Sequence, residues 1–298
     1  MQVQFHLIFL IIGLIFNSAS GQDIKTLKND IKKIIGDKKA TVAVSVTGKK
    51  PADTISINGN QKMPMQSVYK FHLALAVLHQ VDLGHHNLND SIVITKEQLD
   101  NNLWSLIRKK YPNGAKLTLR EIIKYTLANS DNIGCDLLFR LIGGPKAVKQ
   151  YMHEVGITDI SIKHNEQTMQ SDWKLQYQNW TTAKSASKTL KLFFENVNQE
   201  LSKESHSFLW ETMKTSWFGK ISMKSYLPVN TVIAHKTGHS GKNGKGITGA
   251  QNDIGIIFLP NGNYYYLSIL ISDSKEANEV NQKLIAGITK LTFNYFNK

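Results

Sequence analysis

Residues 66–80, QSVYKFHLALAVLHQ, place two polar side chains on the buried face of a helix. After Tyr69 the apolar residues recur at helical spacing, which predicts an amphipathic helix with the stripe Leu73, Ala74, Val77, Leu78 and Val81. Extended backwards by three or four residues, this stripe reaches Lys70 and then Ser67. Burying an unpaired ammonium group is costly, so a lysine on this face calls for a chemical explanation.

Ser67 and Lys70 form a pattern that can activate a nucleophile. Positions i and i+3 are neighbours on a helix, and a serine hydroxyl needs an adjacent base to attack at neutral pH. A lysine amine that is desolvated, or that lies near other cations, has a lowered pKa and can be that base. In the alternative interpretation Ser67 caps the helix and Lys70 extends to solvent, because Ser-x-x-Lys alone is a common pattern.

The segments before this helix predict one helix and two strands. Residues 24–37 have helical spacing, and residues 40–48 alternate with a period of two. Residues 52–60 fit the hairpin partner of that strand.

The segments after it are helical up to about residue 208, and then strands return. Residues 231–238 fit one strand, and residues 253–273 fit a hairpin whose turn is Pro-Asn-Gly-Asn. Residues 274–296 predict a long final helix. The fold class is therefore α+β, with the early strands beside the late ones in one antiparallel sheet flanked by the terminal helices.

This order also predicts two lobes. Residues 22–61 and 209–298 are expected to form an α/β lobe, and residues 62–208 an all-helical lobe. A cleft between lobes is a natural ligand site, and the helix that carries Ser67 begins where the chain leaves the sheet.

The N-terminus resembles an export signal. Residues 5–16 are apolar, too few for a membrane span, and small polar residues follow them. We expect residues 1–21 to be a signal peptide, although this stretch lacks Lys and Arg and an uncleaved anchor is the alternative. Cys135 is the only cysteine, so an intrachain disulfide is excluded and we interpret it as a buried thiol.

The formal net charge of +13 raises the question of nucleic-acid binding. The only arginines are Arg108, Arg120 and Arg140, and the lysines are spread along the whole chain. Lysine is poorly suited to bidentate recognition, so a solvated lysine surface is the better interpretation. The histidines, including the adjacent His85 and His86, lack the spacing of a metal site.

Three further stretches carry groups that could act on a substrate. Ser130-Asp131-Asn132 lies where a helical run breaks, and Lys236-Thr237-Gly238 ends an apolar strand. Glu166 lies in a polar stretch between helices. Each alone has an ordinary explanation: a helix cap, a strand end and a solvated loop acid.

Together, Ser-x-x-Lys, Ser-Asp-Asn and Lys-Thr-Gly in this order, with the glutamate, are the signature of class A β-lactamases and penicillin-binding proteins. Over nearly the whole exported chain the sequence resembles a class A serine β-lactamase. The stretches PMQSVYKFHLALAVLHQVDLG, SDNIGCDLLFRLIGGP, QYQNWTT and AHKTG are similar to its extended-spectrum PER-type branch. The resemblance implies the fold shared by serine β-lactamases and D,D-peptidases.

The resemblance also implies the catalytic roles. Ser67 would attack the lactam carbonyl, Lys70 would be the base beside it, and Ser130 would pass a proton to the leaving nitrogen. Glu166 would activate the water that hydrolyses the acyl-enzyme. The expected substrate-binding residues are Asn132, Gln170, Lys236, Thr237, Gly238, His239 and Ser240, and the main-chain N–H groups of Ser67 and His239 would form the oxyanion hole.

The sequence departs from the family pattern at three places. Gln170 stands where the family commonly has an asparagine that helps to hold the water. His164 and Asn179 stand at the ends of the Glu166 loop and cannot form the usual Arg–Asp pair, which predicts a differently tethered loop and a wider mouth. No arginine follows Arg140, so the family's carboxylate-binding arginine has no counterpart; the candidates to replace it are Lys220, Lys224, His239 and Ser240.

The expected protein is a periplasmic monomer that hydrolyses a small-molecule β-lactam, with extended spectrum. It needs no cofactor or metal, binds no nucleic acid and has no stable membrane association after signal cleavage. The main alternative is a D,D-peptidase that deacylates slowly, and two others are a non-catalytic receptor and a polyanion-binding protein.

Overall fold

The structure is a computed structural model that describes residues 23–298 except 217, 219 and 220. The expected signal peptide, residues 1–21, lies outside the described residues. Within the described part of the chain, no helix is both long and apolar enough to cross a membrane.

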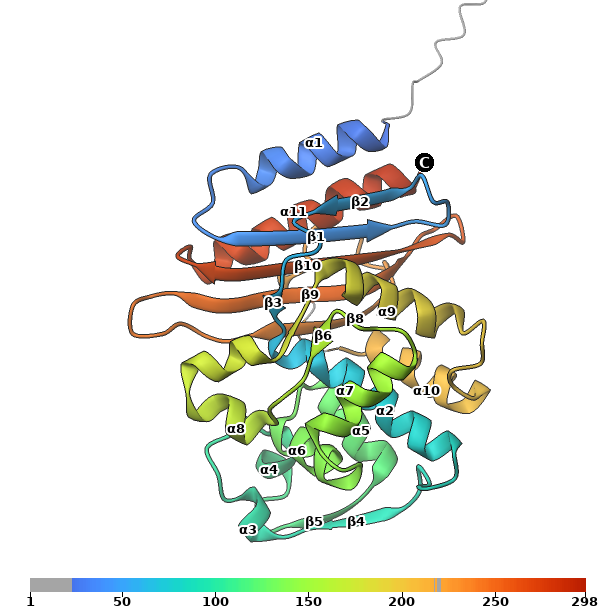
Figure 1. Ribbon diagram of the computed structural model, residues 1–298, viewed down its shortest axis with the longest axis vertical. Coiled ribbons are helices and arrows are strands. Elements are labelled where there is room, and N and C mark those ends of the chain that lie inside the picture. The colour runs from blue at the N-terminus through green and yellow to red at the C-terminus, as the bar shows by residue number, and fades with distance from the viewer. Residues whose placement is uncertain (1–22, 217, 219–220) are drawn as a thin grey trace, which may run out of the picture.

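A five-stranded antiparallel sheet forms the upper half of the molecule in Figure 1. Its order is β2-β1-β10-β9-β8, so strands from the two ends of the chain lie side by side. The strands are β1 (Thr41–Thr47), β2 (Thr54–Ile57), β8 (Ile233–His239), β9 (Thr248–Phe258) and β10 (Tyr264–Ser274). The predicted pairing of early with late strands is confirmed: Thr41 lies opposite Ser272 and Thr47 opposite Tyr266.

The two predicted hairpins are also present. Strands β1 and β2 pair antiparallel, and β9 and β10 are joined by the Pro-Asn-Gly-Asn turn, with Phe258 opposite Tyr264. Gly262 in this turn has φ +78°, a conformation that glycine adopts without steric cost. Strand β9 begins at Thr248, five residues before the predicted start, because the buried residues 248–252 continue the ladder.

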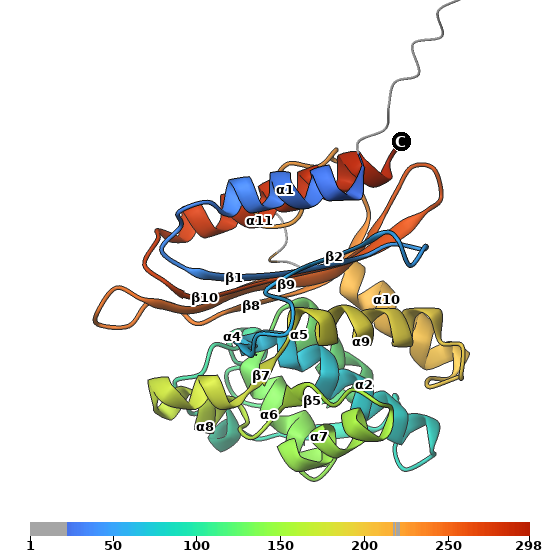
Figure 2. The same ribbon diagram turned by 45° about the horizontal axis from the view of Figure 1, so that its top comes forward.

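Helices α1 (Ile24–Ile35) and α11 (Asn278–Phe296) cover one face of the sheet (Figure 2). Helix α1 starts at the N-cap Asp23, whose carboxylate accepts from the Thr26 N–H. Leu27 and Ile31 of α1 pack with the outer faces of the strands in one hydrophobic cluster that also includes Ile285 of α11. The terminal helices therefore flank the sheet as predicted.

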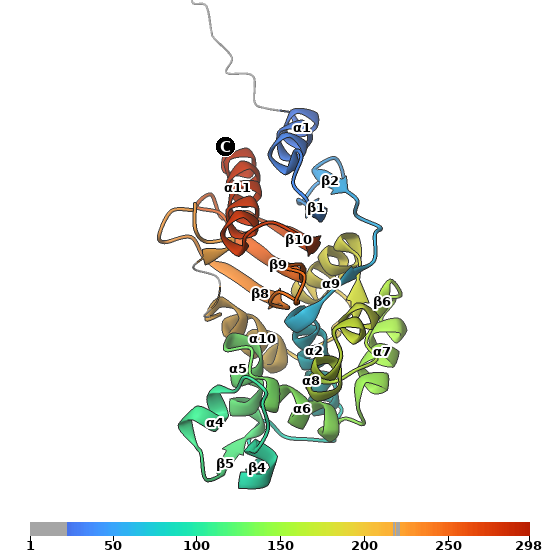
Figure 3. The same ribbon diagram turned by 90° about the vertical axis from the view of Figure 1, so that its left-hand side faces the viewer.

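The other face of the sheet packs on the helical half of the molecule (Figures 2 and 3). Helix α9 (Ala183–Glu195) lies directly against the sheet, where Ser187 Oγ donates to Ser268 Oγ over 2.9 Å. The helices of this half are α2 (Tyr69–Asp82), α3 (Lys96–Leu99), α4 (Leu106–Lys110), α5 (Leu119–Ala128), α6 (Asn132–Leu141), α7 (Pro145–Glu154), α8 (Glu166–Ser171), α9 (Ala183–Glu195) and α10 (Lys203–Lys214).

Helix α2 is the central helix of this half. Every residue from Tyr69 to Leu78 is buried, because α5, α6, α7 and α10 pack around α2. The predicted amphipathic pattern is therefore wrong over the first ten residues, which have no solvent face. Helix α10 contacts both α2 and β8, so the predicted lobe boundary after residue 208 falls within a helix that joins the two halves.

Short strands inside the segment predicted as helical were missed. Strands β4 (Ser91–Ile94) and β5 (Ala115–Thr118) form a two-stranded sheet. Strands β3 (Met63–Pro64), β6 (Ile160–Ser161) and β7 (Trp180–Thr181) form another. Pairs of two residues are too short for a period-two pattern to be recognised.

Candidate active site

Ser67 lies in a 3₁₀ turn, Gln66–Val68, that leads directly into α2. The hydroxyl does not cap the helix, because neither the turn nor α2 has a side-chain cap. Gln66 has φ +46°, a conformation that is rare for a residue with a side chain. The turn therefore leaves the Ser67 side chain available at a half-buried position.

Lys70 is fully buried and does not extend to solvent. Its Nζ donates to the main-chain oxygen of Ser130 over 2.8 Å and to Oδ1 of Asn132. The same nitrogen lies 3.1 Å from Oε1 of Glu166. A buried ammonium that is paired and hydrogen-bonded in this way is tolerated, whereas an unpaired one is not.

The Ser130 loop is held by its neighbour Asp131. Asp131 caps α6 by accepting from the Gly134 N–H over 2.8 Å, and it also accepts from Ser105 Oγ and the Ile107 N–H. These contacts show that Asp131 holds the loop together. The Ser130 backbone is left-handed, with φ +57°, and its main-chain oxygen and hydroxyl contact two different lysines.

Lys236 is the second buried lysine of the site. Its Nζ donates to Ser130 Oγ and to the Thr237 carbonyl, each over 3.0 Å. Burial, followed by repulsion from Lys70, lowers the pKa of Lys236 to about 7, against the opposing charges of Asp253 and Glu166. A lysine with this pKa can bind an anion when it is charged and release a proton near neutral pH.

Gly238 brings β8 against the turn that carries Ser67. A Cβ at position 238 would lie 2.4 Å from the Met65 carbonyl oxygen and 3.2 Å from the Ser67 nitrogen. The close approach of two backbones requires glycine here, as the sequence predicts for a strand next to a ligand site.

Glu166 is the first residue of α8 and is almost fully buried. Gln170 lies one turn later on the same helix, and its Nε2 donates to Glu166 Oε2 over 2.7 Å. Oε1 of Glu166 faces Lys70 but has no hydrogen-bond partner among the described residues, since the 3.1 Å contact lacks hydrogen-bond geometry. Gln170 therefore occupies one oxygen of the carboxylate and leaves the other on the side of the lysine.

Asp136 of α6 anchors the start of α8, and sequence reasoning missed it. Its carboxylate accepts from the main-chain N–H groups of Glu166 and Gln167 and from Asn165 Nδ2, over 2.8 to 3.1 Å. Burial raises the pKa of Asp136 to about 6, against the effect of the two main-chain donors. The only signal in the sequence is an acid within the apolar run NIGCDLLFRL.

The loop that carries Glu166 is closed by hydrogen bonds of Asn179. Its Oδ1 accepts from the N–H groups of Lys163 and His164, and its Nδ2 donates to the His164 carbonyl. Asn179 is fully buried. The loop ends are thus held by an amide and main-chain groups, which agrees with the prediction that no ion pair closes them.

Two adjoining hollows open above these groups. One, of about 330 Å³, is lined by Ser67, Trp104, Ser130, Asn132, Phe218, Thr237, Gly238 and His239. The other, of about 410 Å³, shares Asn132 and His239 and extends to Gln66, Met169, Gln170, Asp172, Trp173, Gln176, Ser240 and Gly241. The predicted site residues therefore lie in these walls or, for the buried Lys70, Glu166 and Lys236, in contact with them. Sequence reasoning missed the aromatic residues Trp104, Trp173 and Phe218.

Among the candidates to replace the missing arginine, His239 and Ser240 line these hollows. Ser240 Oγ already donates to the Gly241 carbonyl and accepts from the Ala250 N–H. Lys224 is half-buried, and Lys220 lies outside the described residues.

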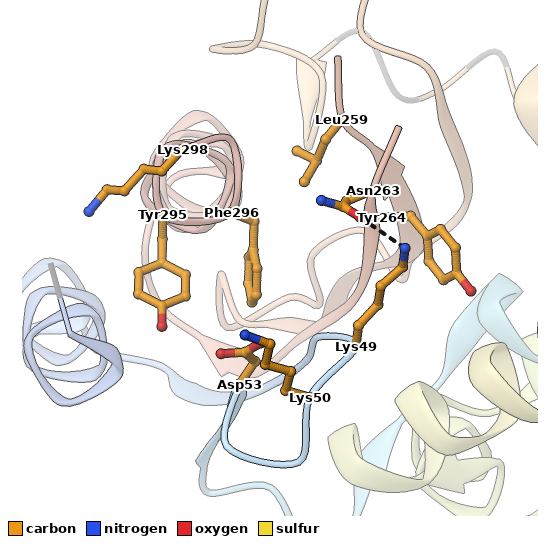
Figure 4. A pocket seen from close by; sticks show the side chains of 9 residues that line it. All are labelled: Lys49, Lys50, Asp53, Leu259, Asn263, Tyr264, Tyr295, Phe296 and Lys298. Carbon is orange, nitrogen blue, oxygen red and sulfur yellow. Dashed lines mark hydrogen bonds between the residues drawn. The ribbon is translucent and has the colours of Figure 1, made fainter. Parts of the chain in front are cut away.

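A separate hollow of about 360 Å³ lies at one end of the strands, between the β1–β2 and β9–β10 turns and beside the C-terminal end of α11 (Figure 4). Lysines and aromatic rings line it, and Lys49 donates to Asn263 there. It contains neither a serine nor a second acid beside Asp53, so it does not offer the groups that acyl transfer requires. In the described part of the chain no cluster of three or more His, Cys, Asp or Glu side chains could hold a metal ion.

The arrangement combines a serine, two buried lysines and a buried carboxylate at one opening. It supplies the groups needed for attack on a carbonyl, for transfer of the serine proton and for hydrolysis of an ester intermediate.

The chain belongs to the beta-lactamase enzyme family, whose sequence profile matches residues 26–296. It is a class A serine β-lactamase, a hydrolase that opens the β-lactam ring and confers resistance to these antibiotics.

Known relatives cover nearly the whole chain. The sequence is 42% identical over 290 residues to beta-lactamase VEB-1 of Pseudomonas aeruginosa, covering 97% of this chain and 96% of that protein. It is 40% identical over 271 residues to the extended-spectrum beta-lactamase PER-1 of the same species, covering 90% and 87%. A crystal structure of a representative class A beta-lactamase from Bacteroides cellulosilyticus superposes with a TM-score of 0.87 at 33% identity, covering 92% and 98%. The resemblance to the PER-type branch is thereby confirmed.

Proposed function

We propose that Ser67 is the nucleophile and that Lys70 accepts its proton, directly or through a water. The observation that carries this assignment is the contact of Lys70 with Ser130, Asn132 and Glu166 in one buried cluster next to Ser67. In this cluster the proton removed from Ser67 can be taken up by Lys70, which is hydrogen-bonded to Ser130. The main-chain N–H groups of Ser67 and His239 bind the developing oxyanion.

Ser130 delivers a proton to the leaving lactam nitrogen. Its hydroxyl accepts from Lys236 over 3.0 Å and its carbonyl from Lys70 over 2.8 Å, so it lies between two proton-holding amines. Lys236, Thr237 and Gly238 bind the substrate carboxylate, and Asn132 binds the side-chain amide.

Glu166 activates the water that hydrolyses the acyl-enzyme. Oε1 has no hydrogen-bond donor among the described side chains and main chain, and Gln170 holds Oε2 over 2.7 Å. A carboxylate fixed through one oxygen can accept a proton from water at the other. Gln170 orients the Glu166 carboxylate. Because Gln170 also lines the second hollow, it contacts the substrate as well.

The spectrum we propose is an extended one that includes oxyimino-cephalosporins. Two adjoining hollows of about 330 and 410 Å³ meet at Asn132 and His239, which gives room for a bulky acyl side chain. The loop end held by Asn179 without an ion pair, and the likeness to PER-1, support the same proposal. We also propose export to the periplasm, on the basis of residues 1–21, and a monomeric state.

The test compares the mature protein with Glu166→Gln by stopped flow and mass spectrometry, using benzylpenicillin and cefotaxime. We expect turnover of both by the parent, and a single burst with a stable Ser67 adduct in the variant, as deacylation slows by roughly 10²–10⁴-fold. Glu154→Gln, an exposed acid of α7, is the control and should behave as the parent. A single burst in the parent would contradict the assigned deacylation, and failure to turn over cefotaxime would contradict the extended spectrum alone.

A further inference from the structure

A buried, hydrogen-bonded histidine–aspartate pair lies on the other face of the strand that carries Lys236. His235 precedes Lys236 on β8, so their side chains point to opposite faces of the sheet. On β9, Asp253 lies opposite Thr237 and on the same face as His235. His235 Nδ1 and Asp253 Oδ1 are 2.8 Å apart, and both side chains are fully buried.

This pair is not what core packing would select by default. Among the described residues, the second oxygen of Asp253 accepts only from the Met223 N–H, over 3.3 Å, and His235 Nε2 has no hydrogen-bond partner. Removing a carboxylate from water for so few contacts is costly, and an apolar pair of similar volume would be at least as stable. A role in the reaction would explain why a charge is kept here.

We infer that Asp253, held by His235, is a positioning residue that keeps Lys236 positively charged for binding the substrate carboxylate. This inference rests on the proposed role of Lys236. An ionised carboxylate can only accept hydrogen bonds, so His235 donates its Nδ1 proton to Asp253. This hydrogen bond holds the negatively charged Asp253 carboxylate in place.

The titratable groups around Lys236 come from four elements. Lys70 of α2 opposes its protonation, whereas Glu166 of α8, Asp253 of β9 and, to a smaller extent, the Cys135 thiol of α6 favour it. Glu166 already lies 3.1 Å from Lys70. Asp253, on the neighbouring strand, raises the pKa of Lys236 more than Glu166 does. Of the two carboxylates, Asp253 therefore does more than Glu166 to offset the repulsion that Lys70 exerts on Lys236.

The test replaces Asp253 by asparagine, which keeps the shape and an oxygen for the Met223 N–H but removes the charge. The value of kcat/KM is measured from pH 5.5 to 9 for a cephalosporin acid and for its methyl ester. The alkaline limb of the pH profile of kcat/KM reports the pKa of the group that must be protonated in the free enzyme. We expect this limb to move to lower pH by ~1 unit for the acid, mainly through KM, because a charge on an adjacent strand acts strongly in a partly buried site. The ester should show no shift.

Two further variants make the result specific. In a Lys236→Arg background the Asp253→Asn change should produce no alkaline shift, because a guanidinium stays charged throughout this range. Glu195→Gln, an acid of α9 outside both hollows, should keep the parent profile. If thermal unfolding shows that Asp253→Asn does not fold, Asp253→Ser is the second charge-free variant, since its hydroxyl can still accept from Met223.

A folded Asp253→Asn enzyme with the alkaline limb of the parent would overturn the inference, and so would an equal loss at every pH, which indicates a purely structural role. The proposed role of Lys236 itself would fail on a different result. In that case the parent enzyme would hydrolyse the ester and the acid with equal kcat/KM at every pH.

Discussion

At the scale of single residues, the site depends on charges that are buried but paired. Lys70 and Glu166 lie 3.1 Å apart, and Lys236 and Ser130 are 3.0 Å apart. Because these groups are buried, each contact is stronger than in solution, and each group left alone would carry a large desolvation cost. Removing one member therefore perturbs the protonation of the others as well as its own function.

Gly238 gives a sharp prediction at this scale. Gly238→Ala would place a Cβ 2.4 Å from the Met65 carbonyl oxygen, a main-chain atom that cannot turn aside. We expect β8 to move away from the Ser67 turn, and kcat/KM for a chromogenic cephalosporin to fall by about 10²-fold, because small displacements of catalytic groups are costly.

Gly244→Ala is the matched control. No atom lies within 4 Å of its added Cβ, and its φ is not positive, so activity and melting temperature should stay unchanged. A Gly238→Ala enzyme with full activity would mean that the close approach of the two backbones has no part in catalysis.

The residues of the site differ in how far the sequence could predict them. Ser67, Lys70, Ser130 and Lys236 belong to short motifs whose chemistry is readable in order. Asp136 could not be found in this way, because its role depends on α8 folding back onto α6, a contact between positions thirty residues apart. The same holds for the aromatic residues of the hollows and for Asp253, which meet the site only in three dimensions.

At the scale of elements, α8 is a helix of six residues whose position depends on its anchor. A helix this short is not stable alone, so side chains outside it must fix its first turn. Asp136 does so through two main-chain donors and Asn165, and Asn179 closes the loop behind it.

Asp136→Ala is predicted to slow deacylation more than acylation. Loss of the three hydrogen bonds frees the first turn of α8 and misplaces Glu166, so hydrolysis of the acyl-enzyme should fall by about 10²-fold. Stopped-flow traces would show a burst of normal rate followed by slow turnover. The exposed Asp159 gives the control Asp159→Ala, with kinetics equal to the parent. Parent-like turnover by Asp136→Ala would refute the anchoring role.

Elements were predictable where their pattern is long or their turn chemistry strong. The β9–β10 hairpin has an Asn-Gly turn between two long apolar runs, and the terminal helices have sustained helical spacing. The pattern of α2 was misleading because a helix enclosed on every side has no polar face to reveal. The two-residue strands β3, β6 and β7 exist only because other segments lie beside them.

At the scale of the whole molecule, the sheet joins the two ends of the chain, and α2 crosses the middle of the helical half (Figure 3). This topology places Ser67 and Lys236, which are far apart in sequence, at one opening. It was predictable because both flanking segments are strands with one helix each, and pairing them in one sheet buries both. The same enclosure of α2 has a consequence for stability in acid.

His72 of α2 is fully buried, and neither ring nitrogen has a hydrogen-bond partner among the described residues. Burial lowers its pKa from 6.5 to about 4, and the nearby Val68 main chain opposes this shift without forming a hydrogen bond to the ring. Between these values the unfolded chain binds a proton that the folded protein does not, so stability present above pH 6.5 is lost as pH falls towards 4. The loss from this group amounts to ~3 kcal/mol.

His72→Leu should remove that part of the acid sensitivity. The free energy of unfolding in urea is measured for parent and variant at pH 7.5 and pH 4, where the parent should lose ~3 kcal/mol more than the variant. The exposed His153 supplies the control His153→Leu, which should lose as much as the parent. Equal losses in all three proteins would mean that a group other than His72 takes up the proton, because an apolar leucine at a fully buried position has no charge to gain.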